Sequence, residues 1–226
     1  FMVLCGVAAG TLFVTQNVPN IESSPGWKEA LFWANKNLPQ EAAFFNWWDE
    51  GHWASFLANR KVIIDNRNAD TQATSDVAQF VLAQSEEQGY ALVSKYQGTH
   101  LLFGDDLLDK LANLGFFAYN ITDPSDPRLQ GLFGRVFNCE KKVATLTREV
   151  TFSCGGNNFT PQQMDSVPTQ WREAPNQLDG GTPLNVYREE DNSKLYAFTQ
   201  TGNKSLLVRL WMHDPAITKF KEIYRN

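Results

Sequence analysis

The sequence lacks the residues that would form a metal framework. Its three cysteines include no Cys-x-x-Cys pair, and its three histidines, His52, His100 and His213, lie far apart in the chain. Structural zinc sites need such ligands at short, regular spacings. We therefore expect no metal to be held by this part of the protein.

Clusters of basic residues are also missing. Lysine and arginine total 20 against 25 acidic residues, the formal charge is −5, and the basic residues never run beyond adjacent pairs such as Arg60-Lys61. Binding to nucleic acid depends on neutralising phosphates with clustered positive charge. The composition therefore predicts no nucleic-acid partner.

The apolar run at the start, residues 1–14, is shorter than the roughly 20 residues that cross a bilayer. No basic residue precedes Lys28, so a signal peptide is not indicated. We interpret residues 1–18 as the end of a truncated transmembrane helix. A buried core helix or strand is the alternative.

Two cysteines flank a predicted hairpin arm. Cys139 and Cys154 lie on either side of residues 141–150. A disulfide between them is expected if the domain faces an oxidising compartment. Two reduced, buried thiols are the alternative.

The most unusual stretch is Trp47-Trp48-Asp49-Glu50-Gly51-His52-Trp53. An indole N–H only donates a hydrogen bond, and a carboxylate only accepts one. A hydroxyl between two indoles and an acid can do both, so Trp47, Trp48 and Asp49 are a candidate receptor for a Ser or Thr side chain. We expect Gly51 to permit a sharp turn there. The alternative is that the tryptophans only anchor the core.

Hydrophobic periodicity predicts an α/β fold around this stretch. The expected elements are a helix from Ser24-Pro25 to Pro39, a strand at 42–46, a short helix at 53–58, a strand at 61–65, a helix over 71–84, a helix over 85–96 and a strand at 100–103. Strand, helices and strand at this spacing predict a right-handed crossover and a mainly parallel sheet. The tryptophan stretch would then follow a strand at its carboxyl end, where such sheets place ligand sites.

A cluster of turn residues at 123–127 predicts a boundary between an α/β core, residues 19–125, and a β-rich lobe, residues 126–226. In the lobe we expect strands at 143–152, 184–188, 195–201 and 205–212, hairpin turns at 191–193 and 201–203, a surface excursion at 157–179 and a final helix at 216–224.

The stretch Trp47-Trp48-Asp49-Glu50-Gly51 resembles the Trp-Trp-Asp-Tyr-Gly signature of the oligosaccharyltransferase catalytic subunit, with Glu50 in place of Tyr. Later segments keep the order of that family: Asn59-Arg60, a Val-Ile-x-Asp strand at 62–65, paired helices, and Lys95-Tyr96 before a strand. The resemblance covers residues 20–120 and is to the C-terminal soluble domain of archaeal-type dolichyl-phosphooligosaccharide-protein glycotransferases.

A second signature of that family, Asp-x-x-Lys-x-x-x-Ile or Met, is matched imperfectly. Asp106 and Lys110 are four residues apart instead of three, although such residues still share a helix face. The resemblance implies that Lys110 adds a contact to the acceptor. The alternative is an acidic first turn that complements the helix dipole. Glu50 would need solvent or a partner, for which His52 and Arg60 are candidates.

The resemblance implies a function in protein N-glycosylation. A lipid-linked oligosaccharide would be transferred to the asparagine of an Asn-x-Ser/Thr acceptor, and Trp47, Trp48 and Asp49 would bind the acceptor hydroxyl. The family uses a divalent metal, Mg or Mn, held in its membrane domain, so this part alone would be inactive. The partners implied are the acceptor polypeptide, the lipid-linked oligosaccharide and the membrane, with this domain on the external side.

Two other classes of protein use similar residues. The first is a non-catalytic glycan- or peptide-binding extracellular module, and if it bound glycans it would present exposed, coplanar indoles. A glycosidase needs two carboxylates about 5–10 Å apart. Asp49 and Glu50 would point to opposite faces of a strand, which disfavours the glycosidase.

Overall fold

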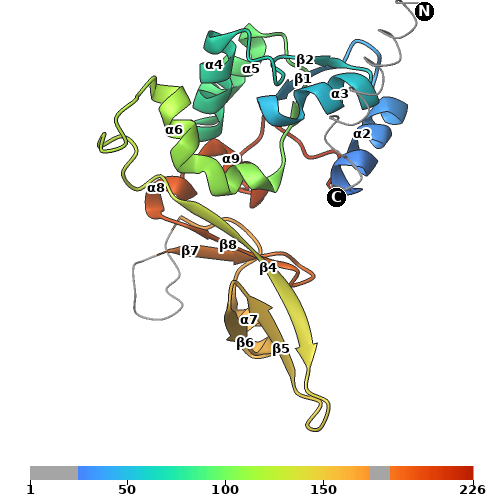
Figure 1. Ribbon diagram of the computed structural model, residues 1–226, viewed down its shortest axis with the longest axis vertical. Coiled ribbons are helices and arrows are strands. Elements are labelled where there is room, and N and C mark those ends of the chain that lie inside the picture. The colour runs from blue at the N-terminus through green and yellow to red at the C-terminus, as the bar shows by residue number, and fades with distance from the viewer. Residues whose placement is uncertain (1–24, 174–183, 226) are drawn as a thin grey trace, which may run out of the picture.

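The computed structural model describes residues 25–173 and 184–225. Figure 1 shows a rounded body from which a narrow β-structure extends. The predicted end of a transmembrane helix at residues 1–18 lies outside the described residues. Among the helices that are described, none is both long and apolar enough to cross a membrane.

The body contains a three-stranded sheet. Its strands are β1 (Ala43–Asn46), β2 (Lys61–Val62) and β3 (His100–Leu102), in the order β2-β1-β3. Both pairings are parallel. This confirms the predicted mainly parallel sheet, although β2 is shorter than the strand predicted at 61–65.

Helices surround this sheet. They are α2 (Pro25–Asn37), the 3-10 helix η2 (Trp48–Glu50), α3 (Gly51–Leu57), α4 (Thr71–Leu82), α5 (Glu86–Lys95), the 3-10 helix η3 (Asp105–Lys110) and α6 (Leu111–Tyr119). Phe44 of β1 packs in a cluster with Leu31 and Ala54. Its neighbour Phe45 contacts Phe80 of α4, with ring centroids 5.2 Å apart. Because successive side chains of a strand point to opposite faces, β1 is buried on both sides.

Capping residues separate the two helices that follow β2. The side chain of Asp70 accepts a hydrogen bond from the N–H of Ala73 at 2.9 Å, and that of Ser85 accepts one from Gln88 at 3.2 Å. Such caps satisfy N–H groups that the first turn of a helix leaves without partners. Asp70 and Ser85 therefore mark separate starts for α4 and α5.

The remaining strands form an antiparallel sheet in the order β6-β5-β4-β8-β7. They are β4 (Gly134–Val143), β5 (Val150–Cys154), β6 (Asn157–Phe159), β7 (Asn185–Arg188) and β8 (Lys194–Phe198). The inner half of β4 pairs with β8, and its outer half, from Cys139, pairs with β5. The predicted β-rich character of the second half is confirmed, whereas the boundaries at residues 18 and 125 stay predictions.

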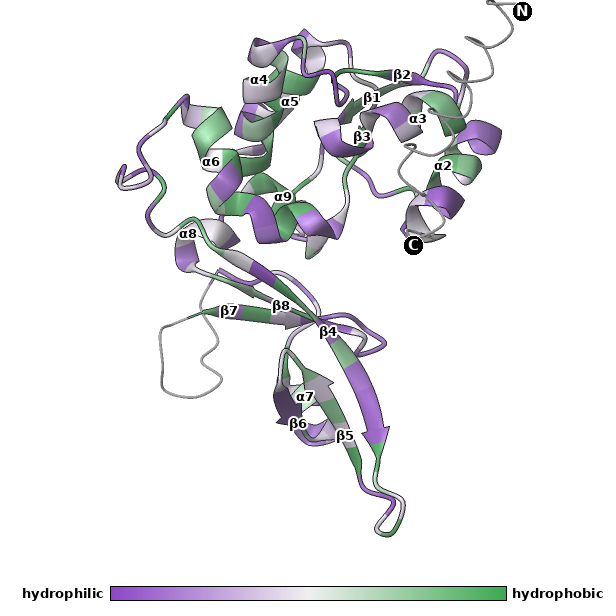
Figure 2. Cartoon of the chain, in the orientation of Figure 1, coloured by the Kyte–Doolittle hydropathy of each residue, from purple (hydrophilic) through white to green (hydrophobic). Residues whose placement is uncertain are grey.

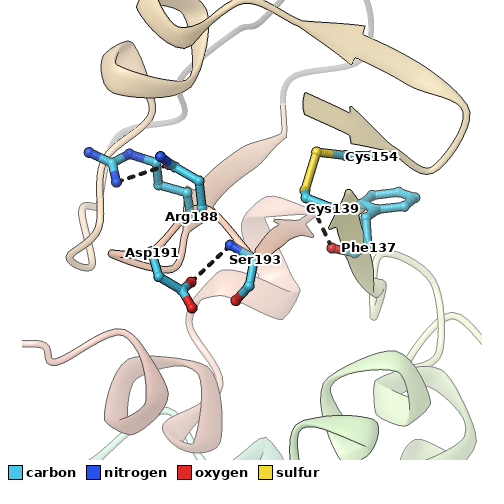
Figure 3. Close-up of a disulfide and its surroundings, with 7 residues drawn as sticks. Phe137, Cys139, Cys154, Arg188, Asp191 and Ser193 are labelled. Carbon is cyan, nitrogen blue, oxygen red and sulfur yellow. Dashed lines mark hydrogen bonds between the residues drawn. A yellow bond between two sulfur atoms is a disulfide. The ribbon is translucent and has the colours of Figure 1, made fainter. Parts of the chain in front are cut away.

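The arm is residues 139–166, which comprise the outer half of β4, β5, β6 and α7 (Pro161–Ser166). Figure 1 shows it pointing away from the body. Phe152 and Met164 belong to an apolar cluster separate from the main core. Cys139 and Cys154 lie opposite each other on β4 and β5 and form a disulfide (Figure 3), which decides between the two alternatives left open by the sequence.

The 3-10 helix η3 joins the antiparallel sheet to the body. Oδ1 of Asp109 accepts a hydrogen bond from the backbone N–H of Val136 on β4 at 2.7 Å. Lys194 of β8 forms an ion pair with Asp105. Since η3 directly follows β3, this one short element contacts both sheets.

Four predictions for the second half are wrong. The strand predicted at 143–152 is interrupted, because residues 144–149 form the turn between β4 and β5. Residues 205–212 form α9 (Leu206–Trp211) instead of a strand, residues 201–203 lie in α8 (Gln200–Asn203) instead of a hairpin turn, and the excursion predicted at 157–179 begins with β6 and α7. Figure 2 shows α9 as a hydrophobic segment within the body. A short apolar run fits a buried strand or a buried helix equally well, so its periodicity is not decisive.

The helix predicted at 216–224 is also wrong, because this described segment runs as irregular chain. The carboxylate of Glu86 accepts hydrogen bonds from the backbone N–H groups of Thr218, at 2.8 Å, and of Lys219. The ring of Phe220 packs edge-on against Phe80, 5.8 Å away. Tertiary partners for the backbone N–H groups have replaced those that a helix would provide.

Candidate functional site

The end of β1 is fixed by the side chain of Asn46. Its Nδ2 donates to the backbone oxygens of Trp47, at 2.6 Å, and Ile64, at 2.9 Å, and its Oδ1 accepts from the N–H of Ile63 at 3.2 Å. The side chain is almost fully buried, at 1% exposure. Asn46 therefore ties the residues after β1 to those after β2, and sets where the tryptophan turn, residues 47–51, begins.

Gly51 is required in this turn for a reason other than the one predicted. Its backbone is right-handed helical, with φ −56° and ψ −41°, which any residue can adopt. A Cβ atom at this position would lie 2.3 Å from the backbone oxygen of Ile64 and 2.5 Å from Cα of Asp65. The sharp turn predicted at Gly51 is therefore wrong. Glycine is needed here because α3 approaches the chain after β2 closely.

Parallel pairing brings the tryptophan turn to η3. Asn46 of β1 is paired with Leu102 of β3, so the segments that follow both strands start side by side. Nζ of Lys110 then lies 2.7 Å from Oδ2 of Asp49 and 2.7 Å from Oδ2 of Asp106. The three side chains are between 36% and 41% exposed. Burial opposes the charge of Lys110, but hydrogen bonds to Asp106 and Asp49 keep its pKa above the ordinary value.

The acidic cluster consists of Asp49, Glu50 and Asp106, each of which offers a carboxylate oxygen within 4.8 Å of the others. Because Asp49 and Glu50 lie on the 3-10 helix η2 and not on a strand, the prediction that they point to opposite faces is wrong. Glu50 is only 6% exposed. Burial, and then the charges of Asp106 and Asp49, raise the pKa of Glu50 to about 8.

The partners predicted for Glu50 bind other groups. Nδ1 of His52 lies 3.9 Å from Oδ2 of Asp65. The guanidinium of Arg60 donates to Oε1 of Gln40 and to four backbone oxygens, among them that of Leu38. Glu50 therefore faces the other two acids and Lys110.

The acidic cluster does not fit a resident divalent metal. The ammonium of Lys110 already neutralises Asp49 and Asp106 at hydrogen-bonding distance. We assign no metal to this position.

The two tryptophans pack edge to face. Their ring centroids lie 6.0 Å apart with an interplanar angle of 82°, and the ring of Phe117 on α6 lies 5.5 Å from that of Trp47. Trp47 is 3% exposed and Trp48 is partly exposed. These perpendicular rings are not the coplanar platform expected of a glycan-binding module.

Donors and an acceptor remain available at the tryptophan turn. Neither Trp47 nor Trp48 donates an indole hydrogen bond to another described residue, and Oδ1 of Asp49 accepts none within the described chain, since Lys110 contacts Oδ2. A hydroxyl can accept from an indole and donate to Oδ1. The structure thus brings together all four residues singled out from the sequence, with Trp47 the most buried.

Sequence reasoning missed two contributors to this site. Asn46 directly precedes the tryptophans, and a polar residue at the end of a buried strand was a usable signal. Phe117 lies 70 positions after Trp47 and carries no local signal. Only the packing of α6 against the turn shows its role.

Relatives of the chain are found in archaea and plants. No protein-family model matches it. It is 31% identical over 100 residues to dolichyl-phosphooligosaccharide-protein glycotransferase 2 of Archaeoglobus fulgidus. The aligned region covers 40% of this chain and 16% of that protein. Glycotransferase 1 of the same organism is 28% identical over 97 residues, covering 38% and 16%. The glycosyltransferase subunit STT3B of Oryza sativa subsp. japonica is 26% identical over 76 residues, covering 34% and 10%.

Its homologues are oligosaccharyltransferases. This confirms the resemblance read from the tryptophan stretch. The matched part spans about a sixth or less of each of these oligosaccharyltransferase proteins, 16%, 16% and 10%.

Solved structures of oligosaccharyltransferases are similar at a lower level. The C-terminal globular domain of one from Archaeoglobus fulgidus has a TM-score of 0.40 and 17% identity, covering 77% of this chain and 96% of that one. An enzyme from the same organism, in complex with an inhibitory peptide and a dolichol-phosphate, has a TM-score of 0.47 and 12% identity, covering 82% and 21%. Another, in complex with Zn and sulfate, has a TM-score of 0.42 and 18% identity, covering 58% and 19%. Scores of this size support no argument about the site.

Proposed function

We propose that this chain is the C-terminal soluble domain of a membrane-anchored oligosaccharyltransferase and that it recognises the Ser or Thr of Asn-x-Ser/Thr acceptors. The observation that carries the proposal is the partly exposed pair of Trp48 and Asp49. On consecutive residues of η2 they offer an indole donor and a carboxylate oxygen, Oδ1, that no other described residue uses.

Each residue has a separate role in the proposal. The N–H of Trp48 donates to the acceptor hydroxyl, and Oδ1 of Asp49 accepts from it. Trp47 is the second donor and fixes the ring of Trp48 by edge-to-face packing. Lys110 orients Asp49 through Oδ2, which leaves Oδ1 for the acceptor.

Such a receptor discriminates because the alternative leaves polar groups without partners. A net hydrogen bond contributes only about 0.5–1.5 kcal/mol, and one to a charged group such as the Asp49 carboxylate about 1.5–3 kcal/mol. A site built to bind a hydroxyl can reject an analogue without it by up to ~10⁴-fold. That is the selection an Asn-x-Ser/Thr acceptor requires against Asn-x-Ala.

The other steps of the reaction are proposed for the rest of the full-length protein. That part would bind the lipid-linked oligosaccharide and hold a divalent metal, Mg or Mn, so the chain studied alone would not transfer sugar. The Cys139–Cys154 disulfide supports an external location, because disulfides persist in oxidising compartments.

The proposal is tested by the peptide selectivity of the full-length protein. Binding of a labelled Asn-x-Thr peptide is competed with unlabelled Asn-x-Thr and Asn-x-Ala peptides, in the wild type and in Trp48→Phe and Asp49→Ala. Trp48→Phe keeps an aromatic ring but removes the N–H, and should reduce the Thr-over-Ala preference about tenfold. Asp49→Ala removes a charged acceptor and should reduce it by about 10- to 100-fold.

Trp53→Phe is the matched control, since it makes the same chemical change on α3 outside the receptor. It should leave the preference unchanged. If Trp48→Phe and Asp49→Ala fold normally and still prefer the threonine peptide as strongly as the wild type, the proposed receptor is wrong.

A further inference from the structure

Glu50 is the most buried member of the acidic cluster. Its residue exposure is 6%, whereas the side chain of Asp49 is 39% exposed and that of Asp106 is 41% exposed. Apart from its own backbone N–H, no described residue donates a hydrogen bond to its carboxyl group. Its carboxyl oxygen nevertheless lies within 4.8 Å of the other two carboxylates.

The charged groups around Glu50 come from two elements. Asp49 lies beside it on η2, and η3 contributes Asp106 and Lys110. On α3 and the segment after β2, the ionisable groups pair among themselves: Asp65 contacts His52 at 3.9 Å and forms an ion pair with Arg67. Lys110 is therefore the cation that Glu50 faces.

We propose that Glu50 is a positioning residue for the acceptor-binding carboxylate of Asp49, and that as a neutral acid it keeps Lys110 shared between Asp49 and Asp106. This inference rests on the proposed function of the tryptophan turn. With Glu50 neutral, two carboxylates face one ammonium. With Glu50 ionised, three carboxylates compete for the same ammonium, and like charges this close repel one another.

Loss of the proton from Glu50 therefore acts on Asp49 through Lys110. An ionised Glu50 attracts the ammonium away from Oδ2 of Asp49, and that carboxylate loses the contact that orients it. A neutral Glu50 also gains a donor, because a protonated carboxyl can donate a hydrogen bond that a carboxylate cannot. The surroundings of Glu50 favour the neutral form, since burial and both neighbouring acids raise its pKa to about 8.

The predicted consequence is a peptide selectivity that falls as the pH rises. A group with a pKa of about 8 is roughly 90% protonated at pH 7 and roughly 10% at pH 9. The Thr-over-Ala preference of the full-length protein should therefore fall about tenfold between these values. The ratio of the two peptides cancels pH effects that they share.

Glu50→Gln, which is neutral at every pH, should abolish this fall, so that at pH 9 it prefers the threonine peptide about tenfold more than the wild type does. Glu87→Gln, an equivalent change at an exposed site on α5, should keep the fall. Asp106→Asn should move the midpoint of the fall to lower pH, because Asp106 contributes the larger of the two charge effects on Glu50.

The direct readout is the titration of the Glu50 side-chain carbon by NMR in the full chain. A midpoint near pH 8 supports the proposal, and a midpoint near the ordinary 4.5 overturns it. So does a pH-dependent fall that persists unchanged in Glu50→Gln. The proposed function fails separately, if Asp49→Ala leaves the preference for threonine intact at pH 7.

Discussion

The arm and the tryptophan turn are held in place by opposite means. In the arm, β4 and β5 are joined by a short turn, pair in register and carry the Cys139–Cys154 disulfide. In the tryptophan turn, the decisive contact joins Asp49 to Lys110, 61 positions apart, and depends on the pairing of β1 with β3. The arm is thus stabilised by local and covalent links, and the site by convergence of distant segments. Changes to the body should therefore affect the site, while changes in the arm should stay local.

The largest expected difference comes from one substitution made in both regions. Leu111, directly after Lys110, is 0% exposed in the main core, whereas Leu146 at the tip of the arm is 97% exposed. Leu111→Ala should lower the free energy of unfolding by about 2–5 kcal/mol, because it leaves a cavity. Leu146→Ala should change it by less than about 0.5 kcal/mol. Urea denaturation followed by tryptophan fluorescence measures both, and similar values would remove the distinction between the regions.

A second difference is in the pH dependence of stability. The pKa of Glu50 rises from 4.5 unfolded to about 8 folded, so between these values the folded chain holds a proton that the unfolded chain has lost. Stability relative to Glu50→Gln should be constant below pH 4.5 and should decrease by about 1.4 kcal/mol per pH unit until pH 8. By pH 7 the decrease reaches about 3 kcal/mol.

Glu149→Gln, in the exposed turn of the arm, is the matched control. Its stability curve should run parallel to that of the wild type from pH 4 to pH 9. A Glu50→Gln curve that is also parallel to the wild type would show that Glu50 titrates normally.

Reduction should affect the arm and spare the site. The disulfide closes a loop with a sequence separation of 15, for which loss of the cross-link costs about 3 kcal/mol. The double variant Cys139→Ser, Cys154→Ser should show this loss in urea denaturation and should no longer respond to reductant. Its Thr-over-Ala peptide preference should equal that of the wild type. A lost preference would mean that the site depends on the arm.

The smallest difference concerns two glycines that are needed for different reasons. Gly51 meets the backbone oxygen of Ile64, so Gly51→Ala should cost about 1–3 kcal/mol by overpacking, and Gly51→Asn should cost more. Gly156, between β5 and β6, has open space around it but a φ of +88°, so Gly156→Ala should cost about 1–2 kcal/mol. Asparagine tolerates positive φ better than alanine, so Gly156→Asn should cost less. Thermal denaturation of the four variants tests whether the order reverses between the sites.

The same contrast explains what could be predicted from the sequence. Elements with local signals, such as the capped helices after Asp70 and Ser85 and the hairpin at residues 141–150, were predictable because short-range chemistry determines them. The segments at 205–212 and 216–224 could not be predicted correctly in this way. Burial stabilises α9, and hydrogen bonds to the distant Glu86 hold the C-terminal chain.

The site divides in the same way. Its place at the end of a strand followed from the apolar residues before Trp47. The residues that surround Glu50 could not be predicted, because their positions depend on the register of Asn46 with Leu102 and on the 3-10 geometry of η2. A strand geometry assumed for Asp49 and Glu50 gave the wrong side-chain directions.

The position of η3 has a mechanical consequence. Asp105 and Asp109, near the two ends of this short helix, tie it to β8 and to the inner half of β4, and Lys110, next to Asp109, contacts Asp49. A shift of β8 and of the inner half of β4 would therefore move the element that carries Lys110. A partner that binds and displaces these inner strands would change the position of Lys110 without touching the tryptophans.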